Sequence, residues 1–171
     1  MEQLWAPWRS AYLKNLPDEE KQDPDSCVFC LLAKTTGDER EKLVLARTEH
    51  AFVVMNRYPY NNGHLLVLPL DHHSCLESLT RDARIDVHEA MVKCVSMIKT
   101  VFACDGLNIG MNLGRAAGAG IPAHLHYHVM PRWAGDTNFS TTVGHLRVIP
   151  EDLYTSYDQL KPHFDTAFAA L

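Results

Sequence analysis

Three histidines alternate with apolar residues in the stretch AHLHYHVMPRW, which spans residues 123–133. Successive side chains of an extended chain point to opposite faces. His124, His126 and His128 therefore lie nominally on one face, and the apolar residues lie on the other, where they can pack on a core. A neutral imidazole, with an ordinary pKa of about 6.5, is both a nucleophile and a metal ligand near neutral pH. The imidazole face is predicted to meet solvent, a metal or a substrate.

A glycine-rich loop, NLGRAAGAGIPA, occupies residues 112–123 and leads directly into the histidines. Gly114, Gly118 and Gly120 allow backbone N–H groups to approach a bound group closely, and successive amides form concavities suited to phosphate. A loop of this kind can also be no more than a tight connection. Its position beside three alternating histidines favours a phosphate site.

A Cys-x-x-Cys pair, Cys27 and Cys30, forms a third pattern. The chain has five cysteines, an odd number that does not fit a disulfide framework and favours a reducing compartment. The pair therefore indicates a redox centre or half of a zinc site, and the lack of a thioredoxin-like strand-to-helix context favours zinc. The other cysteines are expected to pack in or beside a helix as small apolar residues: Cys75, Cys94 and Cys104.

The string N-x-G, followed by A-G and HLHYHVMPR, resembles the signature of the histidine triad family of nucleotide hydrolases and transferases. The resemblance spans residues 27–133 and includes VMNRYPYNNGHLLVLP. LWAPWR near the start and PRWAGDTNF after the triad are similar to the bacterial branch related to diadenosine tetraphosphate phosphorylases. The resemblance implies that His126 attacks the α-phosphorus and forms a nucleotidyl-histidine intermediate. It also implies that His128 contacts the bridging oxygen and assists the leaving group, with no catalytic metal.

The same resemblance implies the groups that bind substrate. Asn56 matches the residue that holds the ribose hydroxyls, and Asn112 matches a loop residue near the phosphates. Each asparagine is also compatible with a turn or a strand-end cap. The full substrate-binding set is Asn56, Asn112, Gly118, Ala119, Gly120 and His128.

A structural zinc site is also implied by the resemblance. Its ligands would be Cys27, Cys30, His72 and His124, a closed four-coordinate set of the structural type. His73 competes with His72, because the register of this histidine pair is ambiguous.

The glycine loop departs from the pattern of the fragile histidine triad hydrolases. A glutamine common in their loop is absent here, where Ala119, Gly120 and Ile121 follow the A-G pair and the loop is one residue longer. We therefore expect inorganic phosphate, rather than water, as the second acceptor. The expected function is nucleotidyl transfer on adenine nucleotides, by phosphorolysis or hydrolysis of diadenosine polyphosphates. The alternatives are a nucleoside phosphoramidate hydrolase and a non-catalytic module that binds nucleotides or is stabilised by zinc.

Short β-rich runs and one long helical stripe predict an antiparallel α+β fold with the helix on one face of a five-stranded sheet. The expected long helix covers residues 80–104, and a short C-terminal helix should begin at Pro150 and end or kink at Pro162. The expected strands are residues 43–47, 51–55, 64–69, 107–112 and 124–131.

The expected organisation is one domain at residues 27–133, between an N-terminal extension at 1–26 and a C-terminal extension at 134–171. The C-terminal extension is expected to pack on the domain or on a dimer. The family resemblance implies a homodimer in which two five-stranded sheets join into a continuous ten-stranded sheet.

The composition of the chain limits the kinds of partner that it is expected to bind. The chain has 171 residues, of which 46% are hydrophobic, enough for one sizeable core. A net charge of −5 gives no extended basic surface for nucleic acid or an anionic membrane. The start, MEQLWAPWRS, lacks the apolar core of a signal peptide, and no later run has the roughly 18 apolar residues of a membrane span. We therefore expect a soluble cytoplasmic protein that binds small molecules.

Two further groups of residues have no clear pattern. Trp5, Trp8 and Trp133 could stack on adenine, although ordinary aromatic burial is the favoured interpretation. The histidines expected at the surface or in turns are His50, His88, His145 and His163.

Overall fold

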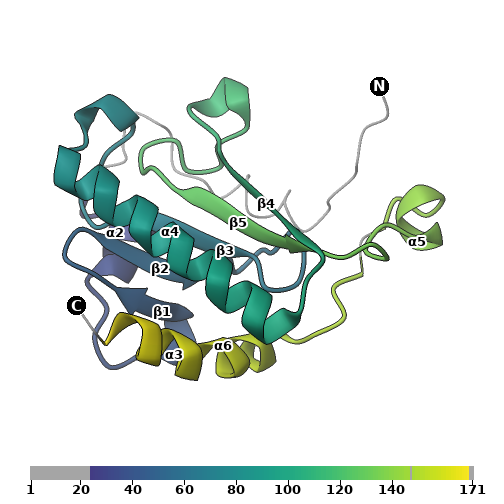
Figure 1. Ribbon diagram of the computed structural model, residues 1–171. Helices are drawn as coiled ribbons and strands as arrows, with labels where there is room; N and C mark the ends of the chain where they lie inside the picture. The colour runs from purple at the N-terminus through teal and green to yellow at the C-terminus, as the bar shows by residue number, and fades with distance from the viewer. Residues whose placement is uncertain (1–23, 147, 170–171) are drawn as a thin grey trace.

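A five-stranded antiparallel sheet forms the centre of the protein, in a computed structural model that describes residues 24–146 and 148–169. Its strand order is β1-β2-β3-β5-β4, and every neighbouring pair is antiparallel (Figure 1). The strands are β1 (Val44–Arg47), β2 (Ala51–Met55), β3 (Leu65–Pro69), β4 (Gly106–Met111) and β5 (Tyr127–Arg132). The predicted α+β class with five antiparallel strands is confirmed. The N-terminal LWAPWR motif, with Trp5 and Trp8, lies outside the described residues.

Two tight connections order the first three strands. The backbone N–H of Thr48 donates to the carbonyl of Ala51 at 2.8 Å and closes the β1–β2 hairpin. Between β2 and β3 the chain turns at Gly63, whose φ of 67° lies in the left-handed region that an Asn-Gly turn requires. Every residue of β2 and β3 is buried, so these strands form the middle of the core.

Helix α4 (Arg81–Phe102) covers one face of the sheet (Figure 1). It begins where the Thr80 side chain accepts a hydrogen bond from the backbone of Ala83, which satisfies one of the free N–H groups of the first turn. Its buried residues recur at helical spacing and confirm the predicted stripe: Ala83, Val87, Ala90, Met91, Cys94 and Ile98. The helix ends in a left-handed residue, Ala103, before the expected Gly106. Within the described part of the chain, no helix is long and apolar enough to cross a membrane.

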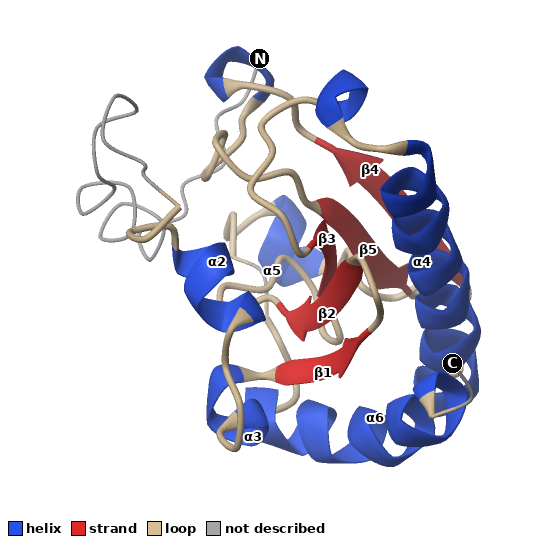
Figure 2. Ribbon diagram, turned by 90° about the vertical axis from the view of Figure 1, so that its left-hand side faces the viewer, coloured by secondary structure: helices blue, strands red, loops and turns tan. Residues whose placement is uncertain are grey.

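Several short helices were not predicted, because they are too short to show hydrophobic periodicity. They are α2 (Val28–Ala33), α3 (Glu39–Lys42), α5 (Phe139–Thr142) and the 3-10 turns η2 (Leu76–Ser78) and η3 (Arg115–Ala117). Figure 2 shows α2 on the opposite side of the sheet from α4. The helix α2 begins at the Cys-x-x-Cys pair and brings these cysteines to the sheet.

The last helix, α6 (Leu153–Phe168), continues past Pro162, where the sequence predicted an end or a kink, so the proline does not end the helix. Asp152 caps its start by accepting from the backbone of two residues in the first turn. A proline inside a helix removes one backbone hydrogen bond, at a cost of about 3 kcal/mol. Leu160 and Phe164, on either side of Pro162, are fully buried, and α6 packs against β1 and α4. Burial on both sides of the proline offsets the lost bond and keeps the helix continuous.

The strand that carries the histidines starts later than predicted. β5 begins at Tyr127, so that His124 and His126 precede it. The β3–β5 ladder stops at the pair Val67 and Tyr127. Beyond that pair, the His124 side chain bonds to the carbonyl of Pro69, and the Leu125 amide donates to a loop carbonyl. These side-chain and loop bonds replace the regular ladder.

We expect Pro162→Ala to stabilise the protein by about 1–2 kcal/mol, because it restores a helix hydrogen bond but gives the unfolded chain more freedom. Urea unfolding measures the change. His163→Ala, at the exposed neighbouring position, is the control and should shift stability by less than about 0.5 kcal/mol. A Pro162→Ala protein no more stable than the parent would show that the missing bond has no net cost in α6.

Candidate functional site

Two adjoining cavities lie on the α2 side of the sheet. The smaller, of about 60 Å³, is lined by His126, His128 and loop residues that include Asn112, Gly118 and Gly120. The larger, of about 370 Å³, is lined mainly by apolar side chains of α2, β2 and β3. The two cavities share five lining residues: Phe29, Asn56, Tyr58, Leu66 and Ile121. A ligand with a flat apolar part and a phosphate could therefore occupy both cavities at once.

The protonation of His126 is fixed by its backbone neighbour. Its Nδ1 lies 2.8 Å from the carbonyl oxygen of His124, which can only accept a hydrogen bond. The proton of a neutral His126 is therefore on Nδ1, and Nε2 keeps its lone pair. Burial lowers the pKa of His126 and so keeps the ring neutral near pH 7. An imidazole in this state is a competent nucleophile.

A fourth histidine, His64, determines the protonation of His128. The Nδ1 of His64 faces two donors, the Tyr60 backbone N–H at 3.1 Å and the Asn56 side-chain amide at 3.3 Å. His64 must then carry its proton on Nε2, which lies 2.9 Å from Nδ1 of His128. Since Nδ1 of His128 accepts this bond, the neutral His128 ring carries its proton on Nε2. His128 is thus a hydrogen-bond donor in the smaller cavity.

Burial keeps His64 uncharged. His64 is fully buried, and desolvation together with the nearby rings of His128 and His126 lowers its pKa to about 3. The Tyr60 ring stacks on His128 with centroids 5.8 Å apart and contacts His64 at 4.9 Å. Near neutral pH, Tyr60 N–H therefore donates to His64, and His64 donates to His128.

Asn56 caps a turn, which is one of the two interpretations of its sequence position. Its Oδ1 accepts from the backbone of Tyr58 at 3.0 Å, which caps the turn after β2. The same side chain orients His64 and lines both cavities. It therefore lies where the apolar cavity meets the histidines.

The glycine loop offers fewer amides than expected. The backbone N–H groups of Gly118 and Ala119 donate within the loop, to the carbonyls of Arg115 and Gly114. Ala119 is buried and does not line the smaller cavity, whereas Gly118 and Gly120 do. Among the backbone hydrogen bonds of the described chain, none engages the amide of Gly120. Gly120 is the loop position best suited to donate to a phosphate.

Asn112 stabilises the loop from its other end. Its side-chain amide donates to the carbonyl of Gly118 at 3.4 Å, across six residues of chain. Gly118 itself has a φ of 92°, a conformation that a side chain would strain. Asn112 therefore stabilises the turn at Gly118 as well as lining the smaller cavity.

Two cysteines and two histidines meet beside the triad. One ligand atom from each of four residues lies within 4.8 Å of all the others: Cys27, Cys30, His72 and His124. His124 Nδ1 is 3.6 Å from the Cys27 sulfur and 3.5 Å from the Cys30 sulfur. The Cys30 sulfur is 3.2 Å from Nδ1 of His72. By contrast, His73 contacts the hydroxyl of Ser78 at 2.9 Å and is outside this cluster.

The four residues fit a tetrahedral zinc ion. With Zn–S bonds of about 2.3 Å and Zn–N bonds of about 2.0 Å, neighbouring ligand atoms should be about 3.5 Å apart. The His124 Nε2–H bond to the Pro69 carbonyl, at 2.9 Å, leaves the Nδ1 lone pair for a metal. Burial and the adjacent Cys27 raise the pKa of Cys30 to about 12 when no cation is present. A divalent cation would supply the charge that two buried thiolates require.

Some residues singled out in the sequence lie away from these cavities. The Trp133 indole N–H donates to the Phe102 carbonyl at 3.4 Å, and Trp133 lines neither of the two cavities. Cys94 is buried in α4, and Cys104 packs beside the core. His88, His145 and His163 are exposed.

Comparison with known proteins identifies the family. The HIT domain family matches residues 38–135. The chain belongs to the HIT family. A Mycobacterium tuberculosis protein named AP-4-A phosphorylase is 40% identical to this HIT protein over 156 residues, covering 88% of this chain and 78% of the relative.

One further HIT protein is similar to this chain in sequence, and another is similar to it in structure. A Schizosaccharomyces pombe bis(5'-nucleosyl)-tetraphosphatase (asymmetrical) is 33% identical over 93 residues, or 54% of this chain and 50% of that protein. The crystal structure of a zinc-bound histidine triad family protein from Mycobacterium smegmatis has a TM-score of 0.68 at 24% identity. It matches 87% of this chain and 100% of its own. The likeness confirms the HIT fold.

Sequence reasoning missed His64 in this HIT protein. The residue directly follows the Asn-Gly turn and precedes five buried strand residues, LLVLP. A histidine at the start of a wholly apolar strand must be buried with a partner, because an unpaired buried imidazole is costly. That rule could have singled out His64, although not its contact with His128.

We expect two histidine tautomers in the site of this HIT protein. In ¹⁵N-labelled protein at pH 7.5, ¹H–¹⁵N correlations should show a proton on Nδ1 of His126 and on Nε2 of both His64 and His128. His64→Leu should shift the His128 nitrogens toward a mixture of tautomers, while His163→Gln should leave them unchanged. A proton on Nε2 of His126 in the parent would contradict the assigned hydrogen bonds.

Proposed function

We propose that the protein transfers a nucleotidyl group from a diadenosine polyphosphate, through an intermediate on His126, to inorganic phosphate. The observation that carries the proposal is the pair of fixed tautomers in one small cavity. His126 presents the lone pair of its Nε2, and His128 presents the proton on its Nε2. His128 is oriented by His64, which lies 64 residues earlier in the chain. The names of the similar proteins, AP-4-A phosphorylase and bis(5'-nucleosyl)-tetraphosphatase, support this class of substrate.

In the first step the lone pair on Nε2 of His126 attacks the α-phosphorus. An N–P bond forms, and the P–O bond to the rest of the polyphosphate breaks. The ring becomes cationic, and its Nδ1–H bond to the His124 carbonyl stabilises that charge. His128 Nε2–H donates to the bridging oxygen as negative charge develops on it.

The larger cavity is the proposed nucleoside site. Its apolar walls suit a purine ring, and Asn56 lies at its junction with the histidines, where the ribose would connect base to phosphate. Gly118 and Gly120 face the phosphates from the loop, with the Gly120 amide as donor. This placement keeps the proposed ribose role of Asn56 and the proposed loop roles of Asn112, Gly118 and Gly120. Ala119 would act only through the loop's shape, since its amide already donates to Gly114.

Phosphate is the proposed second acceptor. It attacks the phosphorus of the nucleotidyl group, the N–P bond breaks, and His126 recovers its lone pair. With diadenosine tetraphosphate the first step releases ATP, and phosphate converts the bound adenylyl group to ADP. The small loop side chains beside the cavity and the name of the relative at 40% identity support phosphate over water. Hydrolysis, which would give AMP, is the second candidate.

A structural zinc held by Cys27, Cys30, His72 and His124 is part of the proposal. The distances among the four ligand atoms and the zinc-bound similar structure support it. The ion would hold α2 against the sheet and fix the ring of His124, whose carbonyl orients His126. It takes no part in the chemistry.

We also propose a homodimer joined at the β4 edges. β4 is an outer strand, and three of its residues are exposed. Unpaired backbone groups at such an edge are available for pairing with a second copy.

His126→Ala should abolish turnover of diadenosine tetraphosphate, because it removes the imidazole that would form the covalent intermediate. His163→Ala, an exposed histidine on α6, should keep full turnover. Chromatography after incubation in millimolar phosphate should show ADP and ATP in equal amounts with the parent protein. Turnover by His126→Ala would refute the covalent mechanism, and AMP in place of ADP would identify a hydrolase. Cleavage of adenosine phosphoramidates alone would favour the phosphoramidase alternative.

Purified protein should contain about one zinc per chain, as a four-ligand structural site requires. Cys30→Ser should lose most of this metal, because one of two thiolates is removed. Cys104→Ser, a half-buried cysteine outside the cluster, should retain it. Mass-spectrometric metal analysis gives the ratio, and a metal-free parent prepared without chelators would contradict the zinc site.

A further inference from the structure

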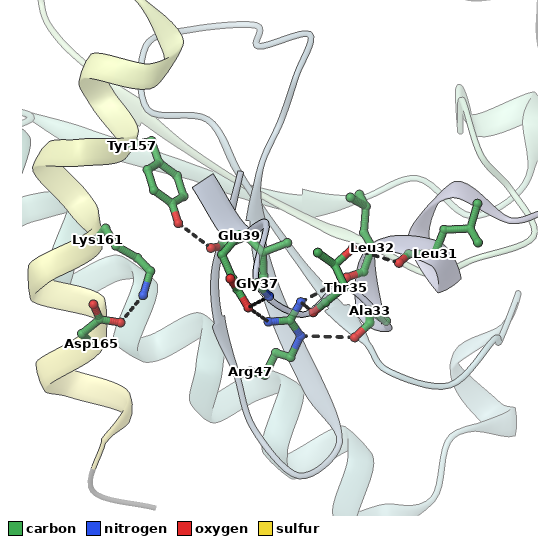
Figure 3. A network of polar contacts seen from close by, with 11 residues as sticks. Leu31, Leu32, Ala33, Thr35, Gly37, Glu39, Arg47, Tyr157, Lys161 and Asp165 are labelled. Carbon is green, nitrogen blue, oxygen red and sulfur yellow. Dashed lines mark hydrogen bonds and ion pairs between the residues drawn. The ribbon is translucent and has the colours of Figure 1, made fainter. Parts of the chain in front are cut away.

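Arg47, the last residue of β1, closes the C-terminal end of α2. Its Nε donates to the carbonyl of Ala33 at 3.2 Å, and its Nη2 donates to the carbonyls of Leu32 at 3.2 Å and Thr35 at 2.6 Å (Figure 3). The last carbonyls of a helix have no partners within the helix and carry partial negative charge. The last turn of α2 contains no basic residue of its own. Arg47 supplies that charge from a neighbouring strand.

The guanidinium of Arg47 also forms an ion pair with a carboxylate. Its Nη1 lies 3.7 Å from the Glu39 carboxylate, which also accepts from the Gly37 backbone at 3.3 Å. The Arg47 side chain is only 27% exposed, so these bonds are partly shielded from water. One planar, five-donor group thus joins β1, the end of α2 and the turn after it (Figure 3).

The helix that Arg47 holds is one wall of the larger cavity. Val28, Phe29, Leu31, Leu32 and Thr35 line it from α2 and the turn that follows. A helix of six residues is too short to be stable by itself and depends on its attachments. The Cys27 and Cys30 cluster attaches its first half, and Arg47 attaches its last turn.

We propose that Arg47 is a positioning residue for nucleotide binding, which fixes the distance between α2 and the opposite cavity wall. Arg47 does not itself line the cavity, so it acts through Leu32 and Thr35, which do. The inference rests on the proposed function, because it takes the larger cavity as the nucleoside site. His126 and His128 line the smaller cavity and not the larger one, and Phe29, which contacts His126, is on the cysteine-anchored half of α2. Loss of Arg47 should therefore weaken binding more than it slows the chemical step.

The test compares three variants in the full chain. Arg47→Met keeps the length and apolar stem but removes all donors, Arg47→Lys keeps the charge without the planar fork, and Arg40→Met is the matched control. Arg40 makes a bidentate pair with Asp158 at 2.8 Å and does not line the larger cavity. Calorimetry with AMP gives the affinity, turnover of diadenosine tetraphosphate gives kcat and KM, and hydrogen exchange reports on residues 28–35.

Arg47→Met should bind AMP about tenfold more weakly, the loss expected for hydrogen bonds from a charged group. Its KM should rise similarly, while kcat stays within about twofold of the parent by the same reasoning. Arg47→Lys should recover part of the affinity, and Arg40→Met should match the parent. Amide hydrogen exchange in residues 28–35 should accelerate in Arg47→Met, accelerate less in Arg47→Lys and stay unchanged in Arg40→Met, with the zinc content unchanged in all three variants.

Two results would overturn the inference. The first is that Arg47→Met binds AMP as tightly as the parent protein does. The second is that Arg40→Met loses as much AMP affinity as Arg47→Met, which would indicate general destabilisation. A parent protein that binds no AMP would refute the proposed function. The anchoring role of Arg47 is tested independently by hydrogen exchange: an unchanged exchange rate in residues 28–35 of Arg47→Met would refute it.

Discussion

The hydrogen bond from His126 Nδ1 to the main-chain carbonyl of His124 is the constraint on which the site depends. It selects the tautomer in which Nε2 of His126 is free. The same residue, His124, uses its ring for two other contacts, with Pro69 of β3 through Nε2 and with the cysteine sulfurs through Nδ1. One residue therefore connects the sheet, the Cys2His2 cluster and the imidazole of His126. Any shift of the His124 backbone would change the direction of the His126 ring.

The sequence was sufficient for the elements whose pattern is long or chemically distinctive. The stripe of α4, the Asn-Gly turn at Gly63 and the antiparallel pairing of the strands all follow from periodicity and turn chemistry. Short elements escaped prediction, because four to six residues show no period. The continuation of α6 past Pro162 could not be foreseen either, since it depends on burial of Leu160 and Phe164 against distant elements. The His64–His128 contact likewise joins residues that only the β3–β5 pairing brings together.

Neutral buried imidazoles make the site sensitive to acid. Because the pKa of His64 in the folded protein is depressed to about 3, protonation favours the unfolded chain. The stabilising contribution of the neutral ring is complete above the ordinary pKa of about 6.5 and is lost as the pH falls from there toward the folded value. The burial that gives His126 its free lone pair thus also limits the pH range over which the folded site persists.

The strand order has a consequence for synthesis on the ribosome. β5 lies between β3 and β4 in the sheet, yet it is the last strand to leave the ribosome. Until residues 127–132 emerge, β3 has an open edge along Leu65, Leu66 and Val67, the residues that later pair with β5. Apolar unpaired edges are the sites at which nascent chains associate. The histidine strand is therefore also the segment that seals the sheet, and a chain stalled before it would be a substrate for chaperones or proteases.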